Sequence, residues 1–178
     1  IFLALMDQSG KINKYKNGYY EFPLAELEKF ESEKAKRKME KKKDYEAPNL
    51  TVRNIVVGSD GSLFIGLEEY RIEAHTSYSS NGGWRTYYTY HYEDILGAKV
   101  NKNGNLEWLR KLPKKQAGTN GRGTMGYKLV NDETGFYFLF LDNKKNMELA
   151  EDEAPKNHTD GFGGQLVVAK IDNAGNIS

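Results

Sequence analysis

The stretch Ala98-Lys99-Val100-Asn101-Lys102-Asn103-Gly104-Asn105-Leu106 decides the fold, because its pattern occurs three times in the chain. The pattern is Ala-x-apolar-(Asp/Asn)-x-x-Gly-x-apolar, and the other two copies occupy residues 4–12 and 169–177. An Asp or Asn side chain can cap a tight turn, and glycine supplies the positive φ that short hairpin loops need. Each copy therefore predicts two strands joined by a turn, and three copies predict a repeat architecture.

The composition favours a β protein with one core. The chain has 178 residues, including 12 Tyr, 8 Phe and 18 Gly, which is typical of strands joined by tight turns. The net charge of +1 gives no electrostatic reason to expect nucleic acid or an anionic membrane surface as a partner. The absence of cysteine excludes disulfides and thiolate sites. No apolar run approaches the roughly 20 residues of a membrane-spanning helix, so no membrane span is expected.

Two complete units of one plan follow each other, over residues 50–116 and 117–178. Each reads strand, turn, strand, insertion, strand, repeat turn, strand. The predicted strands cover residues 51–57, 63–67, 84–92 continuing into 95–100, 106–112, 127–130, 136–141 and 166–171. Such a four-stranded antiparallel meander is the blade of a β-propeller. The predicted fold class is therefore all-β, with about two and a half blades of a propeller in a single segment of a longer repeat protein; residues 1–15 form the partial blade.

A helical insertion is predicted between the partial blade and the first complete one, over residues 16–49. Pro23 opens one charged helix that runs to about Tyr45, since proline is favoured in a first helical turn. Leu24, Leu27 and Phe30 supply an apolar stripe, to which Met39 is a further candidate. Beyond Phe30 the lysines alternate with glutamates, which favours a solvated end projecting into water over a basic surface for nucleic acid or lipid.

Several motifs along the two units carry a family resemblance. They are Asp60-Gly61-Ser62-Leu63, Glu68-Glu69-Tyr70, Asp94-Ile95-Leu96 after the Tyr-rich insertion, Lys99-Val100-Asn101-Lys102-Asn103-Gly104, Trp108, Leu112-Pro113-Lys114-Lys115-Gln116 and Phe140-Leu141-Asp142-Asn143-Lys144-Lys145-Asn146. With them the chain resembles poorly characterised secreted β-propeller-like repeat proteins of the Bacteroidota. The resemblance implies a propeller fold and an exported location, in the periplasm or at the cell surface. It implies no catalytic residues, because the shared motifs are structural.

Four other patterns are candidates for sites. Residues 121–126 read Gly-x-Gly-x-x-Gly, but without a strand before them and a helix after them they indicate a loop between blades. His75, His91 and His158 lack zinc-site spacing, although the first two could face each other across a hairpin. The acidic insertion around Glu151 could hold a hard cation, but a solvated loop is favoured, and the repeat turns are too short for a calcium loop. No metal, cofactor or catalytic residue is predicted.

The candidate binding surface is a Tyr-rich hairpin that leaves the core after residue 67. Its predicted partner-binding residues are Trp84, Arg85, Tyr87, Tyr88, Tyr90, His91 and Tyr92. Strand alternation places the tryptophan and the even-numbered tyrosines on one face and the other three residues on the opposite face. Tyr and Trp on both faces suit protein or sugar recognition, because they bring large contact areas and a polar group. The alternative is cross-strand aromatic packing that only stiffens the hairpin.

These features lead to three hypotheses for the function. The first is a non-enzymatic binding or scaffolding module of an exported or cell-envelope assembly, with a protein, further blades of the same chain or a glycan as its partner. The second is a propeller enzyme or accessory domain that acts on glycans or peptides at a channel mouth. The third is a purely structural spacer. The first is favoured, because no catalytic motif is present.

Overall fold

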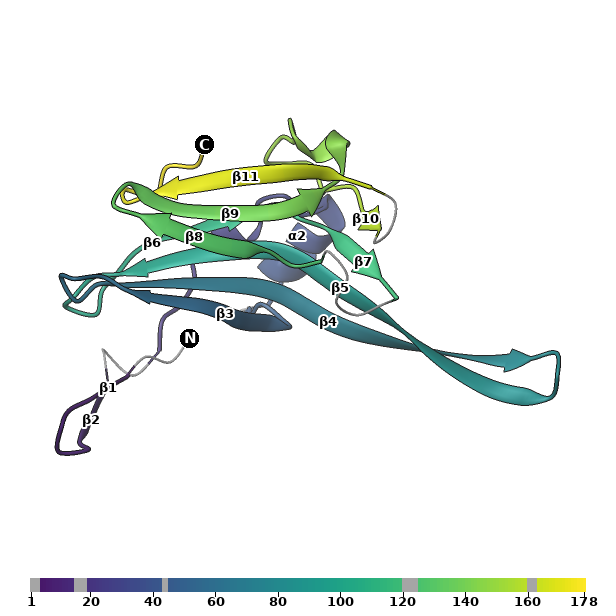
Figure 1. Ribbon diagram of the computed structural model, residues 1–178, viewed down its shortest axis with the longest axis horizontal. Coiled ribbons are helices and arrows are strands. Elements are labelled where there is room, and N and C mark those ends of the chain that lie inside the picture. The colour runs from purple at the N-terminus through teal and green to yellow at the C-terminus, as the bar shows by residue number, and fades with distance from the viewer. Residues whose placement is uncertain (1–3, 15–18, 43–44, 120–124, 160–162) are drawn as a thin grey trace.

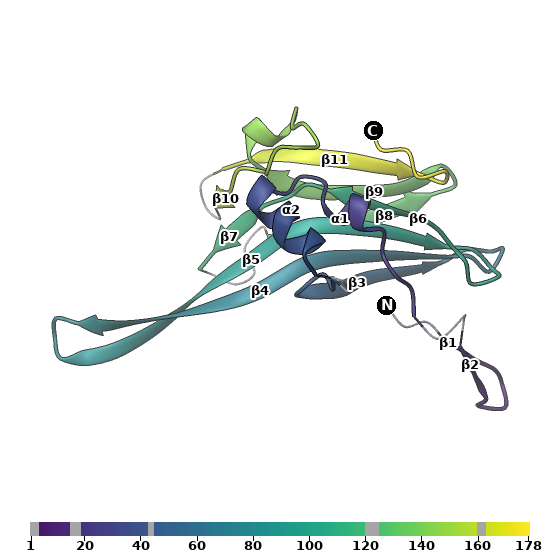
Figure 2. The same cartoon turned by 180° about the vertical axis from the view of Figure 1, so that it is seen from behind.

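The computed structural model describes residues 4–14, 19–42, 45–119, 125–159 and 163–178. Two mainly antiparallel sheets lie one above the other, two short helices cover the far face of the larger sheet, and a long two-stranded arm leaves the body (Figure 1). The same layers are seen from behind in Figure 2. The predicted β-rich fold is therefore confirmed, while the described residues form stacked sheets and no closed ring.

The larger sheet is built on the four-stranded meander that the repeat predicts. Its strands are β3 (Leu50–Val57), β4 (Leu63–Ser79), β5 (Gly83–Val100) and β6 (Leu106–Leu112), and each neighbouring pair is antiparallel. Two short strands extend the sheet at the outer edge of β5. Of these, β7 (Gln116–Gly118) pairs with residues 90–92, and β10 (His158–Thr159) runs parallel to β7. Strand β10 brings the second insertion onto the sheet of the first unit.

The smaller sheet contains the strands of the second unit. Its order is β11 (Gln165–Asp172), β9 (Gly135–Asp142) and β8 (Lys128–Asp132), all antiparallel. A bridge between Ile171 and Ile177 marks the returning strand after the last repeat turn. The insertion between β9 and β11 contains the short 3-10 helix η1 (Lys144–Asn146). The partial unit forms a separate hairpin of β1 (Ala4–Met6) and β2 (Ile12–Lys14).

The three repeat turns share one hydrogen-bond pattern. In each, Oδ1 of the first residue (Asp7, Asn101 or Asp172) accepts from the backbone N–H groups two and four positions later, at 2.8 to 3.0 Å. The glycine three positions after it has a positive φ of 82°, 74° and 87°, respectively. The turn chemistry predicted from the sequence is thus confirmed in all three copies.

The main core lies between the two sheets. Phe64 of β4 stacks on Phe136 of β9, with ring centroids 3.7 Å apart, and Phe138 of β9 and Ile95 of β5 are completely buried beside them. Alternation explains this arrangement, because each strand turns every second side chain toward the other sheet. Trp108 of β6 closes the cluster and donates its Nε1–H to the carbonyl of Asn173 in the last repeat turn.

The prediction of one continuous charged helix is wrong. The insertion forms α1 (Leu24–Leu27) and α2 (Glu33–Glu40), separated at Phe30, whose φ is +60°. Ser32 starts the second helix, since its side chain accepts a hydrogen bond from the backbone N–H of Ala35. The Phe30 N–H is held by the carbonyl of Glu151 in the second insertion, a long-range contact that no local pattern reveals.

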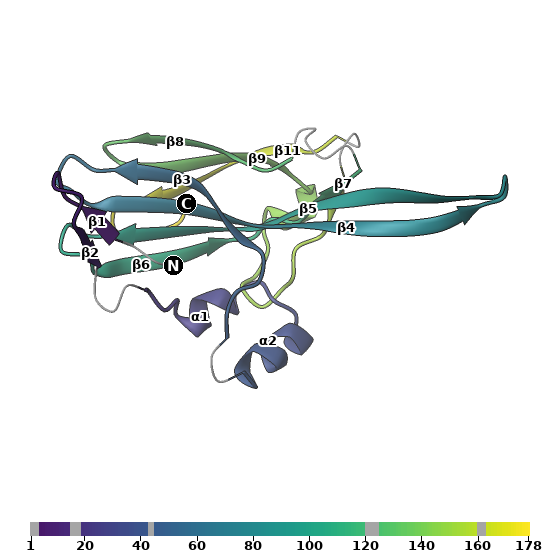
Figure 3. The ribbon, with the colours of Figure 1, turned by 90° about the horizontal axis from the view of Figure 1, so that it is seen from below.

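The break lets both helices lie on the larger sheet. Leu27 of α1 and Met39 of α2 are buried in a second core against Ile65, Leu67 and Leu96. Figure 3 shows both helices on the same side of the larger sheet. The second half of the insertion therefore packs on the sheet, and the expectation that it projects into water is wrong. Lys34 and Lys38 of α2 are exposed, and the half-buried Lys36 pairs with the exposed Glu33.

Candidate functional site

The long arm begins at a β-bulge between β4 and β5. Glu68 pairs with Ile95 and Tyr70 pairs with Tyr92, so that Glu69 alone opposes two residues, Glu93 and Asp94. A bulge of this kind increases the local twist and redirects the strands. Beyond it the two strands leave the body together and join in a turn at residues 80–82 (Figures 1 and 2). The predicted extension thus forms the most protruding part of the described chain.

One face of the arm is aromatic. The cross-strand pairs on it are Tyr78 with Trp84, Thr76 with Thr86, Ala74 with Tyr88, and Ile72 with Tyr90. We refer to these eight residues as the aromatic face. Trp84 is 73% exposed and contacts Tyr78 edge to face, and Tyr88 is 48% exposed. Tyr78 and Trp84 thus pack against each other across the strands, as the stiffening alternative expects, while Trp84 and Tyr88 keep large accessible areas that a partner could contact.

The opposite face of the arm is polar. His75 stacks on Tyr87 and contacts the hydroxyl of Thr89 at 3.0 Å, whereas His91 lies 3.2 Å from a carboxylate oxygen of Glu73. The two histidines thus have different partners and do not face each other across the hairpin. Arg71 donates to Glu73, and this hydrogen bond lowers the pKa of the Glu73 carboxyl. Among the described residues no group of three or more metal-ligating side chains gathers.

The seven predicted site residues do not form one surface. Four of them are exposed along the arm, and two are half-buried near its root. The last, Tyr92, is buried. The exposed residues are Trp84, Arg85, Tyr87 and Tyr88, and the half-buried ones are Tyr90 and His91. A partner that uses the aromatic face would meet Trp84 and Tyr88 but not Arg85 or Tyr87.

Buried ion pairs anchor the root of the arm, and the sequence interpretation missed them. Lys114 Nζ lies 2.9 Å from Glu68 Oε1 and donates to the carbonyl of Tyr92, so it ties both arm strands to the body. Glu68 also accepts from Arg53 at 2.8 Å. Burial lowers the pKa of Lys114, and the negative charge of Glu68 opposes this effect. The indication of these ion pairs in the sequence is Glu68-Glu69, two glutamates that directly follow the continuous apolar strand at residues 63–67.

A second buried pair lies beside the first, on the helix side of the sheet. Lys111 Nζ lies 2.9 Å from Asp94 Oδ2 and 2.8 Å from Glu31 Oε1. Burial would lower the pKa of Lys111, but these carboxylates outweigh it and raise the pKa. Glu69 lies at the same bulge, and burial, helped by the charge of Asp94, raises its pKa to about 8. The bulge therefore concentrates ionisable groups where the arm leaves the body.

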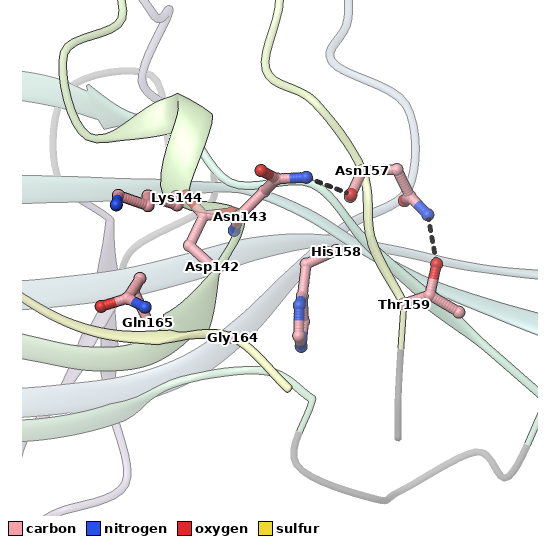
Figure 4. A pocket seen from close by; sticks show the side chains of 8 residues that line it. All are labelled: Asp142, Asn143, Lys144, Asn157, His158, Thr159, Gly164 and Gln165. Atoms are coloured by element: carbon pink, nitrogen blue, oxygen red, sulfur yellow. Dashed lines mark hydrogen bonds between the residues drawn. The ribbon is translucent and has the colours of Figure 1, made fainter. Parts of the chain in front are cut away.

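A polar cavity of about 590 Å³ opens on the side of the second insertion (Figure 4). Its lining residues come from the end of β9, the insertion, β10 and the start of β11. They are Asp142, Asn143, Lys144, Asn157, His158, Thr159, Gly164 and Gln165. Sequence reasoning treated His158 only as an isolated histidine, because nothing local indicates that β10 joins the larger sheet.

Comparisons with protein-family models, curated protein sequences and solved structures found no match to this chain. None of the helices in the described ranges is long and apolar enough to span a membrane. The function is therefore argued from the geometry of the arm, the stacked sheets and the cavity.

Proposed function

We propose that the chain is a non-enzymatic binding module, in which a propeller-like stack of sheets carries an arm that captures a protein partner. The aromatic face of the arm is the observation that carries this proposal. Large, rigid Tyr and Trp side chains lose little conformational entropy on binding and dominate protein interfaces. The buried ion pairs at the root hold the arm in place, so that a partner does not have to order it first.

The register of the two sheets supports a propeller-like stack. Val100 and Ile171 are the residues directly before the second and third repeat turns. Val100 pairs with Leu63 of β4, and Ile171 pairs with Phe136 of β9. These pairs occupy the same place in each repeat. Ile65, which shares its face with Leu63, packs against the helices, whereas the Phe136 face packs against the larger sheet. The two sheets therefore stack in the same sense, head to tail.

Because the sheets stack in this sense, the face of the smaller sheet that points away from the larger sheet is apolar and exposed. Ile95, which packs against the smaller sheet, is 0% exposed, while Leu166 at the equivalent position of the second unit is 65% exposed. Val168, the equivalent of Gly97, is also exposed. We infer that a further sheet of the repeat covers this face, as successive blades do in a propeller. The proposed location of the assembly is the periplasm or the cell surface.

A shortened arm tests the binding role. Deleting residues 74–79 and 83–88 joins Glu73 and Thr89 through the natural turn at 80–82. The same number is removed from each strand, which keeps the pairing register, and the number is even, which keeps each remaining side chain on its face. Wild type and this variant would be compared for partner capture from a cell-envelope extract, with a photo-crosslinker at Ile72, a 52% exposed residue of the aromatic face that both proteins retain, identifying the partner. We expect the shortened variant to lose the crosslinked partner while its sheets remain folded by circular dichroism.

Tyr87 and Tyr88 provide a matched pair of point variants. They are adjacent tyrosines, 51% and 48% exposed, and they lie on opposite faces of the arm. Tyr88→Ser should reduce binding at least tenfold, as expected for an aromatic residue central to an interface, whereas Tyr87→Ser should change it by less than about twofold. Full binding by the shortened variant would refute the proposal, and equal losses in both point variants would refute the role of the aromatic face.

A further inference from the structure

The cavity beside His158 has the features of a built ligand site that is separate from the arm. The insertion that forms it is held by its own hydrogen bonds. Asn146 is buried and bonds the side chain of Asp142 and both backbone groups of Lys156. Asn143 donates to the carbonyl of Asn157 across the same loop. The cavity wall is therefore fixed by the protein itself.

His158 is the second observation that indicates a ligand. Its side chain is 5% exposed, and among the described residues its buried Nε2 has no hydrogen-bond partner. The backbone of Gly164 lies directly against the ring, where an added Cβ would come within 2.7 Å of Cε1. Figure 4 shows the ring between the insertion and the start of β11. An unpaired buried nitrogen costs free energy, and a ligand that bonds to it removes that cost.

The lining determines the chemical class of the ligand. Apart from Gly164, every lining residue is polar, so an apolar ligand would leave many groups unpaired. The negative charge of Asp142 opposes an anion and offsets the charge of the single lysine among the lining residues, Lys144. Within the described residues no cluster suits a metal ion. The side chains of Asn157 and Gln165 offer both donors and acceptors, which match the hydroxyl groups of a neutral sugar.

We propose that this cavity binds a neutral saccharide unit, with Gln165 and His158 among the groups that hydrogen-bond its hydroxyls. A volume of about 590 Å³ is in the usual range for small-ligand pockets. Gln165 is exposed at the first position of β11 and makes no hydrogen bond to another described side chain, so it is free to bind. The proposal does not depend on the arm and remains valid if the arm binds no protein.

The three histidines give an internal control for the test. Ring ¹⁵N resonances of His158, His75 and His91 would be followed by NMR while methyl glycosides of glucose, galactose, mannose and N-acetylglucosamine are added to about 10 mM, enough to detect a Kd of about 1 mM. We expect at least one sugar to shift the His158 signals saturably and to leave those of the two arm histidines unchanged. Inorganic phosphate serves as the anionic probe.

Gln165→Ala and Gln8→Ala are matched variants of exposed glutamines, one in the cavity and one in the first repeat turn. Loss of one neutral hydrogen bond should weaken sugar binding by about two- to tenfold in Gln165→Ala and leave it unchanged in Gln8→Ala. The proposal is overturned if no sugar moves the His158 signals, if phosphate alone moves them, or if both variants bind like the wild type.

Discussion

Lys114 Nζ lies 2.9 Å from Glu68 Oε1, and the two side chains are 0% and 1% exposed. They join the body of the protein to the root of the arm. Removing one member of such a pair leaves the other charge buried without compensation.

Lys114→Met should therefore lower the free energy of unfolding by about 3–5 kcal/mol, measured by urea denaturation. Lys115→Met is the matched control, because the neighbouring lysine is exposed, and it should change stability by less than about 0.5 kcal/mol. In the double variant with Glu68→Leu the loss should be smaller than in the single variant. If Lys114→Met unfolded like its control, the pair would not anchor the arm.

Glu69 should make stability depend on pH. Burial raises its pKa to about 8 in the folded protein, well above the value of 4.5 for an exposed glutamate. The folded state therefore binds more protons between these values, so this group's contribution is complete at pH 4 and is lost as the pH rises through 8. Glu69→Gln has no carboxyl at this position, so it should not lose this contribution as the pH rises. The free energy of unfolding of the variant should therefore increase relative to that of the wild type from pH 5 to pH 9.

The measurement is urea unfolding at several pH values, with the exposed Glu148→Gln as control. The control should keep the wild-type slope. Parallel curves for the wild type and Glu69→Gln would show that Glu69 ionises normally in the fold.

Gly175 of the last repeat turn should be less replaceable than Gly10 of the first. Both have a positive φ, 87° and 82°, so alanine strains the backbone at either site. At Gly175, however, a Cβ would also lie 2.9 Å from Cγ of Trp108, whereas at Gly10 nothing lies within 4 Å. Gly175→Ala should cost about 2–3 kcal/mol in urea unfolding and Gly10→Ala about 1 kcal/mol or less. Equal losses of stability in the two variants would mean that the Trp108 ring moves away from the added methyl group without a cost in free energy.

The outer face of the smaller sheet can be tested by thiol labelling, because the chain has no cysteine. Val168→Cys places a thiol on that face, and Glu148→Cys places one on an exposed loop. In the 178-residue chain alone both should react rapidly with a maleimide. In an assembly isolated from cells with its partners, the cysteine at 168 should react about tenfold more slowly than the one at 148, because the further sheet that we propose would exclude the reagent. Equal rates there would contradict the stacked arrangement.

Local chemistry in the sequence predicted most of the strands and turns. The hydrogen bonds of the repeat turn join residues no more than four positions apart, so Asp7, Asn101 and Asp172 form the same turn in three different surroundings. Strand β6 matches the predicted residues 106–112, and the two faces of the arm follow from the alternation of side chains along a strand. Each of these features depends on neighbours in the sequence.

The remaining features of the fold depend on partners far along the chain. The helix breaks at Phe30, whose N–H is held by the carbonyl of Glu151. Lys114 is buried against Glu68, which lies next to the bulge, and His158 lies at the cavity because β10 pairs with β7. Whether a buried charge or an unpaired nitrogen raises or lowers the stability of the fold depends on the groups that surround it in space. The sequence alone therefore determined which residues form the repeat and the arm, and the packing of distant segments decided where the helices break, what anchors the arm and where a ligand could bind.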